Sequence, residues 1–344
     1  RFGAELTDPA FLTFRDAVTN HIGVSAQTHG RVFAIMYDIS GMSETPSLFD
    51  QVVEDWKHLV DELGVTANPR YMRHDGLPVL GIWGLGFQDR PGAPADDLAL
   101  IEHLQETIEA PYRVRVLGGV PEGWRTSGGT SKPGYASVYD AYDLISPWSV
   151  GRYDNGGYEG FRQGHVVPDL AQRGADSYVP VIWPGFSWRN LRANQDQVDA
   201  DLNAIPRLGG DFLWRQAWGA FSAGATMAYI AMFDEVDEST AIFKAAENIS
   251  DIPTSGTFLT LDADGEALPS DWYLRMAGET VNLFRGVYTY QPQHPIVNAT
   301  PHGPTVCGDG WCTPALEDCA TCAIDCPCPA GSACDGGQCA EVFQ

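Results

Sequence analysis

Six short apolar segments, each followed by a segment with a helical pattern, recur along the first 290 residues of the chain. Turn-forming residues bound each apolar segment, which is typical of a strand buried on both faces of a parallel sheet. This alternation predicts an α/β fold in which crossover helices join parallel strands. The predicted strands span residues 31–39, 77–85, 112–120, 143–146, 177–183 and 225–233.

Capping and breaking residues locate the helices between these strands. Asp8-Pro9 starts the first helix, because proline is tolerated at the first helical position, and Gly64 can end the second. Pro168 lies inside a helical pattern and predicts a kink or a break there. Helices are predicted over residues 11–23, 47–63, 95–109, 134–142, 157–173, 211–223 and 271–284, with a further short strand at 257–261.

Both a (β/α)8 barrel and a doubly wound sheet fit this alternation. A dinucleotide-binding sheet is disfavoured, because no Gly-x-Gly-x-x-Gly pattern follows a strand. Five tryptophans at or just after the ends of four successive strands favour a barrel, whose strand ends share one face. We therefore predict a (β/α)8 TIM barrel over residues 1–290. The five are Trp83, Trp124, Trp148, Trp183 and Trp188.

These aromatic side chains also bear on the ligand. Flat apolar rings with polar tips suit sugar rings and their hydroxyl groups. The alternative for any one tryptophan is packing of a helix onto the barrel, and that interpretation has equal weight. Five together favour a sugar-binding face.

The last predicted strand, 225–233, runs directly into an acidic turn. Strand carboxyl ends are where α/β folds carry their chemistry. Ser239 or Thr240 can cap a helix that begins at residue 241. The acidic residues of the turn are Asp234, Glu235, Asp237 and Glu238.

Carboxyl groups this close together suit glycoside hydrolysis, which needs one protonated and one ionised acid. Like charges raise at least one pKa and so keep a proton donor near neutral pH. The alternative is a solvated acidic turn at a helix N-terminus. His74, His165 and His294 lack metal-ligand spacing, and no Gly-x-Ser-x-Gly elbow occurs, so we predict neither metal nor cofactor. We interpret Asp262-x-Asp264-Gly265 as a turn.

Charge and hydropathy exclude other partners. The formal net charge of −24 argues against binding to nucleic acid, whose phosphates attract Lys and Arg. No apolar run is long enough to cross a membrane. We expect a monomer acting on an oligo- or polysaccharide.

All cysteines lie in residues 307–344, after a proline-rich segment at 291–306 that we interpret as a linker. An even number of crowded cysteines in so short a segment indicates a disulfide-rich module, and hence a secreted or cell-surface protein. The alternative is a zinc module, since one pair has Cys-x-x-Cys spacing. The eight are Cys307, Cys312, Cys319, Cys322, Cys326, Cys328, Cys334 and Cys339.

The acidic turn resembles a known family. Residues 232–238, Met-Phe-Asp-Glu-Val-Asp-Glu, are similar to the Phe-Asn-Glu-Trp-x-Glu-Gly segment of family 99 glycoside hydrolases, which are (β/α)8 endo-α-mannosidases. Segments 37–41, 81–86, 145–148 and 183–188 look like the bacterial proteins called family 71/99-like. The resemblance covers about residues 1–288.

The resemblance implies roles for the two glutamates. Glu235 would act on the sugar 2-hydroxyl, which attacks the anomeric carbon, and Glu238 would be the general acid/base, so that configuration is retained. The expected function is a secreted, retaining endo-glycosidase of α-linked glycans, with mannose-configured sugars as the first candidate. Substrate contacts are expected from Tyr37, Asp38, Trp83, Trp124, Arg125, Trp148, Tyr153, Trp183, Trp188, Asp234 and Asp237.

Departures from the family pattern keep the substrate open. Val236 stands where the family has tryptophan, Asp234 where it has asparagine, and Ser239 where it has glycine. The alternatives are an α-glycanase of another polysaccharide, such as an α-glucan, and a non-catalytic carbohydrate-binding barrel. The family's first two strands have no counterpart here, so we expect an upstream segment to carry them.

Overall fold

The computed structural model describes residues 9–42, 46–193, 200–287, 289–296, 320, 332–335 and 338–341. Its main sheet has four parallel strands in the spatial order β1-β3-β4-β5, with β2 added antiparallel to β3. These strands are β1 (Ile35–Asp38), β2 (Arg73–His74), β3 (Leu77–Trp83), β4 (Arg115–Pro121) and β5 (Leu144–Trp148).

Two further parallel strands continue this series. The segment before β6 (Val181–Ile182) pairs with β5: the Ile145 amide donates to the Ser177 carbonyl at 2.8 Å, and the Val179 amide donates to the Ile145 carbonyl at 2.9 Å. β6 pairs in parallel with β7 (Tyr229–Ile230). In the described part of the chain six parallel strands therefore follow one another in chain order, and each predicted segment contains or overlaps one of them, although β6 and β7 are shorter than predicted. The closed eight-stranded barrel stays a prediction.

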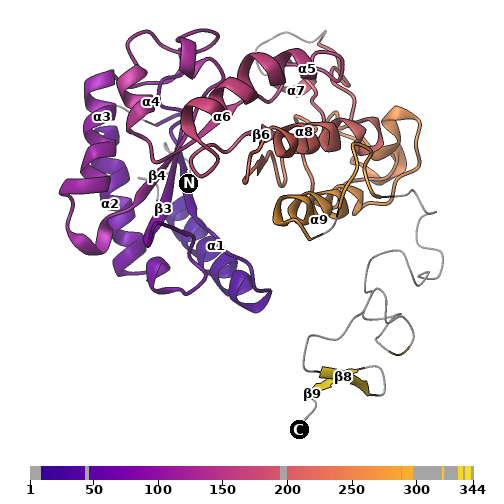
Figure 1. The fold of residues 1–344 in the computed structure, drawn as a ribbon, viewed down its shortest axis with the longest axis horizontal. Coiled ribbons are helices and arrows are strands. Elements are labelled where there is room, and N and C mark those ends of the chain that lie inside the picture. Colours follow the sequence, from indigo (N-terminus) through magenta and orange to yellow (C-terminus); the bar gives the residue numbers. More distant parts are fainter. Residues whose placement is uncertain are drawn as a thin grey trace.

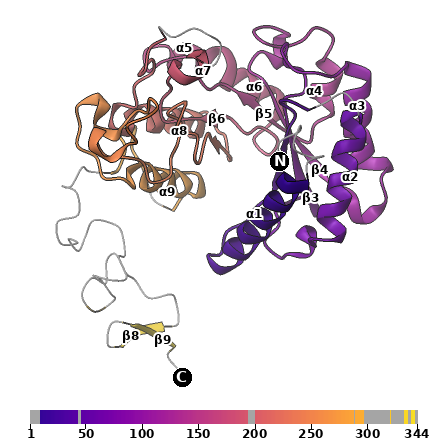
Figure 2. The same cartoon turned by 180° about the vertical axis from the view of Figure 1, so that it is seen from behind.

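Helices flank these strands along the outside of the arc in Figures 1 and 2. The α-helices are α1 (Pro9–Thr28), α2 (Leu48–Asp61), α3 (Pro94–Glu102), α4 (Ala136–Ala141), α5 (Tyr158–Phe161), α6 (Val167–Arg173), α7 (Arg189–Ala193), α8 (Asp211–Ser222) and α9 (Trp272–Arg285). Two π-helical segments, η3 (His103–Thr107) and η6 (Arg162–Val166), extend α3 and join α5 to α6. The 3₁₀ turns are η2 (Val65–Ala67), η4 (Ala110–Tyr112), η5 (Trp124–Thr126), η7 (Leu208–Gly210), η8 (Ile249–Asp251) and η9 (Leu261–Asp264).

Local sequence signals account for several helix ends. The Ser47 side chain accepts a hydrogen bond from the Asp50 amide and so caps α2. After α2 the chain turns at Gly64 with φ of 62°, a left-handed conformation that glycine adopts without strain. Pro168 lies in the first turn of α6, where the helical segment is divided by η6, as the sequence predicts. Gly265 ends η9, so the predicted turn at 262–265 is confirmed.

The buried side chains form three apolar clusters. The largest joins the main sheet to α2, α3 and α4 and includes Trp56, Leu80 and Val116. A second lies between α8 and α9, and a third surrounds Trp183 beside β6 and contains Phe212 of α8. Burial of this apolar surface is the main force that holds helices against strands.

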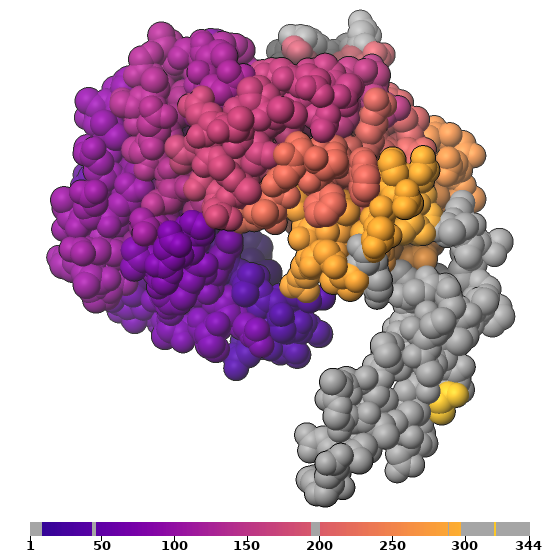
Figure 3. All heavy atoms as spheres, viewed as in Figure 1, coloured from indigo at the N-terminus to yellow at the C-terminus, as the bar shows by residue number. Residues whose placement is uncertain are grey.

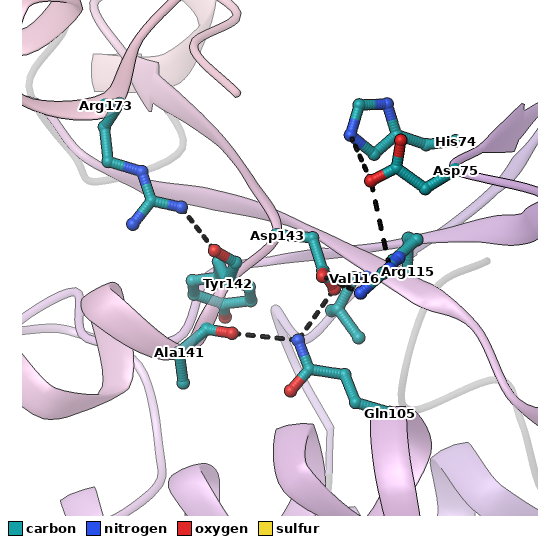
Figure 4. Close-up of polar contacts among 9 residues, drawn as sticks. All are labelled: His74, Asp75, Gln105, Arg115, Val116, Ala141, Tyr142, Asp143 and Arg173. Carbon is teal, nitrogen blue, oxygen red and sulfur yellow. Dashed lines mark hydrogen bonds and ion pairs between the residues drawn. The ribbon is translucent and has the colours of Figure 1, made fainter. Parts of the chain in front are cut away.

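A polar cluster stabilises the amino ends of β4 and β5, as Figure 4 shows. Asp143 accepts hydrogen bonds from the Val116 amide at 2.8 Å and the Gln105 side chain at 2.7 Å, and pairs with Arg115 at 2.8 Å. Arg173 donates to the Tyr142 carbonyl. The carboxylate thus fixes the register of the two strands at the end opposite the acidic turn.

The described elements form an open arc, with α1 and α9 on either side of a notch that Figure 3 shows. On α1 a stripe of apolar side chains is exposed rather than buried, and its members are Phe11, Phe14, Val18 and Ile22. Among the described parallel strands, β1 and β7 lie at the two edges. The upstream strands that would lie between them stay a prediction.

Three local predictions are wrong. Only Tyr229–Ile230 of segment 225–233 forms a strand, and it is half-buried because β6 covers only one of its edges. No helix begins at residue 241: the Ile242 and Phe243 amides donate instead to the carbonyls of Met232 and Phe233. Segment 257–261 is not a strand, and its end enters the 3₁₀ turn η9.

The predicted linker begins with residues that pack on the preceding domain. Ile296 is buried in the apolar cluster of α8 and α9, and Trp214 donates to the Gln291 carbonyl at 3.1 Å. Farther on, β8 (Ser332–Asp335) and β9 (Gln338–Glu341) form an antiparallel pair in which Cys334 is in register with Cys339. The other six cysteines lie outside the described residues, so the disulfide module and its boundaries stay predictions.

Candidate active site

The acidic turn follows β7 at its carboxyl end, where the sequence predicts the chemistry. The carbonyl of Glu235 accepts hydrogen bonds from the amides of Thr240 and Ala241, at 3.2 and 3.1 Å. These bonds close a tight loop in which Asp234 is exposed while Glu235 and Glu238 are half-buried. Partial burial of the two glutamates distinguishes this loop from an ordinary solvated turn, whose acidic side chains would be exposed.

Three residues that follow β6 hold this loop from outside. The Ser187 amide donates to the Glu238 carbonyl at 2.8 Å, and the Asn190 side chain donates to the Asp237 carbonyl at 2.9 Å. Arg207 donates through Nε and Nη2 to the Ser239 carbonyl at 3.2 and 2.7 Å. The acidic loop is therefore bonded through its backbone to the neighbouring strand's loop, which leaves its carboxyl groups unused by these bonds.

Arg207 is buried and lies over the Tyr273 ring, 4.6 Å from the ring centroid. It binds the carbonyl of a strained residue, because Ser239 has φ of 62°, in the left-handed region that favours glycine. Sequence reasoning missed Arg207, Ser187 and Asn190, since nothing local to them indicates contact with a turn far along the chain.

Both glutamates have raised pKa values. Burial, the charge of Asp237 and a hydrogen bond with Asp237 raise the pKa of Glu235 to about 6. Burial, followed by the charges of Glu235 and Asp237, raises the pKa of Glu238 to about 7. Between these values one carboxyl group is mainly ionised while the other mainly keeps its proton. That is the pair of states that general base and general acid require.

Asp38 brings the first strand to the same site. It is the last residue of β1, and its charge contributes to the raised pKa of Glu235. The Asp38 carboxylate also accepts a hydrogen bond from the Ser40 amide at 2.8 Å. The carboxyl ends of β1 and β7, the outermost of the six parallel strands, are thus within electrostatic reach of one another.

Trp83 and Trp148 meet at the ends of β3 and β5. Their rings pack edge to face with centroids 5.4 Å apart, across the intervening strand β4. Gly119 of β4 makes this possible, because a Cβ there would lie 2.2 Å from the Trp83 ring. Both rings are half-buried, and Nε1 of Trp83 has no hydrogen-bond partner among the described residues. The two rings are nearly perpendicular, and Phe87 and Arg90 also lie against the Trp83 ring, so the aromatic platform stays a prediction.

Trp124 and Arg125 have a structural partner instead. Both donate to the buried carboxylate of Asp169 in α6, at 3.1 and 2.7 Å. Trp124 is buried, and its indole packs with the main apolar cluster. Their positions support a role in joining η5 to α6 and give no support to the predicted contact with substrate.

Three other predicted contact residues are also buried. Tyr37 donates to Asp55 of α2 at 2.6 Å and lies between the sheet and that helix. Tyr153 donates to Gln216 of α8 at 3.0 Å, and Trp183 packs against Tyr153 and α8. These side chains form the core beneath the strand ends. Trp188 is half-buried and lines a cavity together with Arg152 and Phe161.

No three His, Cys, Asp or Glu side chains of the described residues gather as a metal site would require. Nor does any helix in the described part of the chain have the length and apolar character needed to cross a bilayer.

Comparison with solved structures identifies a related fold. The structure of the GH99 endo-α-mannosidase from Bacteroides thetaiotaomicron aligns with a TM-score of 0.56 at 16% identity, covering 83% of this chain and 74% of that one. The structure of that enzyme in complex with Bis-Tris propane aligns with a TM-score of 0.55 at 16% identity, covering 83% and 78%. No protein-family model and no curated protein sequence matches the chain. At this identity the likeness shows a shared fold.

Proposed function

We propose that this protein is a glycoside hydrolase that cleaves α-linked glycans at the acidic loop after β7. The observation that carries the proposal is the pair Glu235 and Glu238, half-buried at strand carboxyl ends, with pKa values raised to about 6 and about 7. The aromatic pair of Trp83 and Trp148 offers apolar ring surface for a sugar beside strand ends. The fold shared with a GH99 endo-α-mannosidase supports this chemistry by analogy.

In the proposed reaction, Glu235 is ionised and takes the proton of the sugar 2-hydroxyl, whose oxygen attacks the anomeric carbon. Glu238 is protonated and donates its proton to the leaving oxygen, then removes a proton from the water that opens the intermediate. As the intermediate opens, Glu235 returns its proton to the 2-oxygen and is ionised again. Anomeric configuration is retained, because two displacements occur at the same carbon. Asp234 and Asp237 tune the charge of the loop.

The finer substrate assignment is also a proposal. An endo-acting enzyme on mannose-configured glycans, exported from the cell, is the version that the resemblance of the loop favours. Val236, where the family has tryptophan, is 38% exposed, so an apolar side chain smaller than an indole would face the substrate. An enzyme acting on an α-glucan, or a barrel that binds glycans without cleaving them, would use the same surface.

The experiment is a screen of purified protein against α-mannans, α-glucans and other polysaccharides, with products separated and weighed by mass spectrometry. Oligosaccharide products from an α-mannan support the proposal, and oligosaccharides from an α-glucan alone support the glucanase. Binding to glycans without any cleavage across the panel would establish the carbohydrate-binding alternative.

We predict a bell-shaped pH profile of kcat/KM. Activity rises as Glu235 ionises, with a pKa of about 6, and falls as Glu238 loses its proton, with a pKa of about 7. Asp237→Asn removes a negative charge that raises both pKa values, so both limbs move to lower pH. Asp140→Asn, an exposed carboxylate in α4, is the matched control. A profile unmoved by Asp237→Asn would contradict the electrostatic account.

A further inference from the structure

A cavity of about 710 Å³ lies between the segment that follows β5 and the segment that follows β6. Its wall includes Arg152, Asp154 and Phe161 from the first segment, and Trp188 and Ile205 from the second. Both segments leave the strands at their carboxyl ends, which is the same end as the acidic loop. The cavity contains neither Glu235 nor Glu238 and is therefore separate from the catalytic pair.

One wall of the cavity carries hydrogen-bonding groups with free capacity. His165 stacks on Phe161, with centroids 4.5 Å apart, and its Nδ1 donates to the Glu122 carbonyl at 3.1 Å. This bond leaves Nε2 as an acceptor. Arg152 pairs with Glu122 at 3.7 Å through Nε, and its side chain makes no hydrogen bond to another described residue, so its terminal nitrogens can donate to a ligand. Donor and acceptor on one wall match the hydroxyl groups of a sugar.

The remaining walls are an aromatic ring and bare backbone. Trp188 lines the cavity, Arg192 lies over its ring at 4.9 Å from the centroid, and Phe186 packs against the ring edge to face. Gly160 and Gly164 also line the cavity and present no side chain, and a Cβ at either would meet no atom of the described residues within 4 Å. A ring for stacking, polar groups for hydroxyls and space for a bulky ligand are together the features of a carbohydrate subsite.

Backbone bonds connect this cavity to the catalytic loop. Ser187, the residue before Trp188, donates its amide to the Glu238 carbonyl at 2.8 Å. Asn190, two residues after Trp188, donates its side chain to the Asp237 carbonyl. Since consecutive Cα atoms are about 3.8 Å apart, the Trp188 backbone lies within about one sugar unit of the loop.

We propose that this cavity is a distal subsite that binds an uncharged pyranose unit of the glycan, away from the bond that is cleaved. A neutral ligand fits better than an ion, because the nearby charges offset one another: Glu122 and Asp154 are negative, and Arg152 and the Arg192 over Trp188 are positive. Occupation of the subsite selects for long chains. The inference rests on the proposed function for its catalytic consequence, whereas binding in the cavity can be measured independently.

The test fills the cavity from its glycine wall. Gly160→Met introduces a side chain where a Cβ meets no atom of the described residues, and glycine replacement within a helix favours the fold. The expected result is an increase of about tenfold in KM for a hexasaccharide relative to a disaccharide of the same linkage, the change that loss of about 1.4 kcal/mol of binding produces. Gln163→Met, exposed on the adjoining π-helical segment and outside the cavity wall, is the matched control.

Binding is measured separately by calorimetry on the Glu238→Gln variant, with an α-mannohexaose and an α-glucohexaose as probes. The proposal expects weaker binding with Gly160→Met and with Arg152→Gln, and no change with Gln163→Met. Equal KM ratios and equal affinities in all variants of an active enzyme would overturn the subsite and leave the proposed function standing. If the wild type cleaves no glycan, the proposed function fails, and calorimetry alone decides the subsite: absence of binding by either probe overturns it.

Discussion

Glu238→Gln is expected to lower kcat/KM for natural glycans by about 10²–10⁴-fold, the usual contribution of a general acid. The amide keeps the shape of the side chain but has no proton to give to the leaving oxygen. The same variant should lose much less activity on an activated aryl glycoside, because that leaving group departs in the first step without a proton. Glu235→Gln should instead lower kcat/KM on both substrates, because the 2-hydroxyl must be deprotonated in either case.

The control is Glu102→Gln, which removes an exposed carboxylate of α3 and should leave the activity on both substrates unchanged. Full hydrolysis of a natural glycan by Glu235→Gln or Glu238→Gln would exclude the assigned residue from catalysis. Equal losses on natural and activated substrates in both variants would mean that the roles cannot be divided as proposed.

Glu238→Gln should also stabilise the protein at high pH. The pKa of Glu238 is raised by folding, so its ionisation destabilises the folded state, and this penalty grows from about pH 4.5 and is complete above about pH 7. The variant should therefore gain on the order of 1–3 kcal/mol of unfolding free energy at pH 8 and nothing at pH 4. Thermal melting of the variant and the wild type at pH 8 and at pH 4 measures the stability difference at each pH.

Arg207→Met is expected to lower the free energy of unfolding by roughly 2–4 kcal/mol, because two hydrogen bonds from a charged donor are lost and the Ser239 carbonyl is left unpaired. Catalysis should fall as well: the loop after Glu238 loses the contact that holds Ser239 in its left-handed conformation. The kcat of folded protein, measured well below the melting temperature, should drop by more than tenfold.

Matched variants separate positioning from general stability. Arg285→Met removes an equivalent charge at the exposed end of α9 and should leave kcat and melting unchanged. Arg207→Lys keeps the charge but cannot form the same pair of bonds, so it should restore part of the stability lost in Arg207→Met while kcat stays below the wild-type value. If Arg207→Met melts and turns over like the wild type, Arg207 has no role in positioning the loop.

Much of the fold was predictable, because its signals are local. Apolar runs bounded by turn residues located six parallel strands, and Pro168 located the interruption between α5 and α6. The acidic turn was also predictable, since four carboxyl groups directly after an apolar run are visible in the sequence. Helix formation at 241–247 was predicted wrongly, because a capping residue is a local signal while the competing partners, the carbonyls of Met232 and Phe233, are supplied by the folded loop.

Which tryptophans contact one another and which are held in the core could not be predicted from strand ends alone. Trp83 and Trp148 meet only because Gly119, on the strand between them, leaves room, whereas Trp124 is held by Asp169 from a helix far along the chain. Each outcome depends on a partner distant in sequence. The same holds for Arg207, whose role depends on a carbonyl 32 residues later.

The sequence by itself determined the order of strands and helices and the position of the two glutamates, because periodicity, capping and chain breaking act between near neighbours. The tertiary structure alone decided that Glu235 and Glu238 are half-buried, that Asp38 from the first strand raises the pKa of Glu235, and that a buried arginine holds their loop. Burial and charge proximity set pKa values, and both arise only when distant segments pack together.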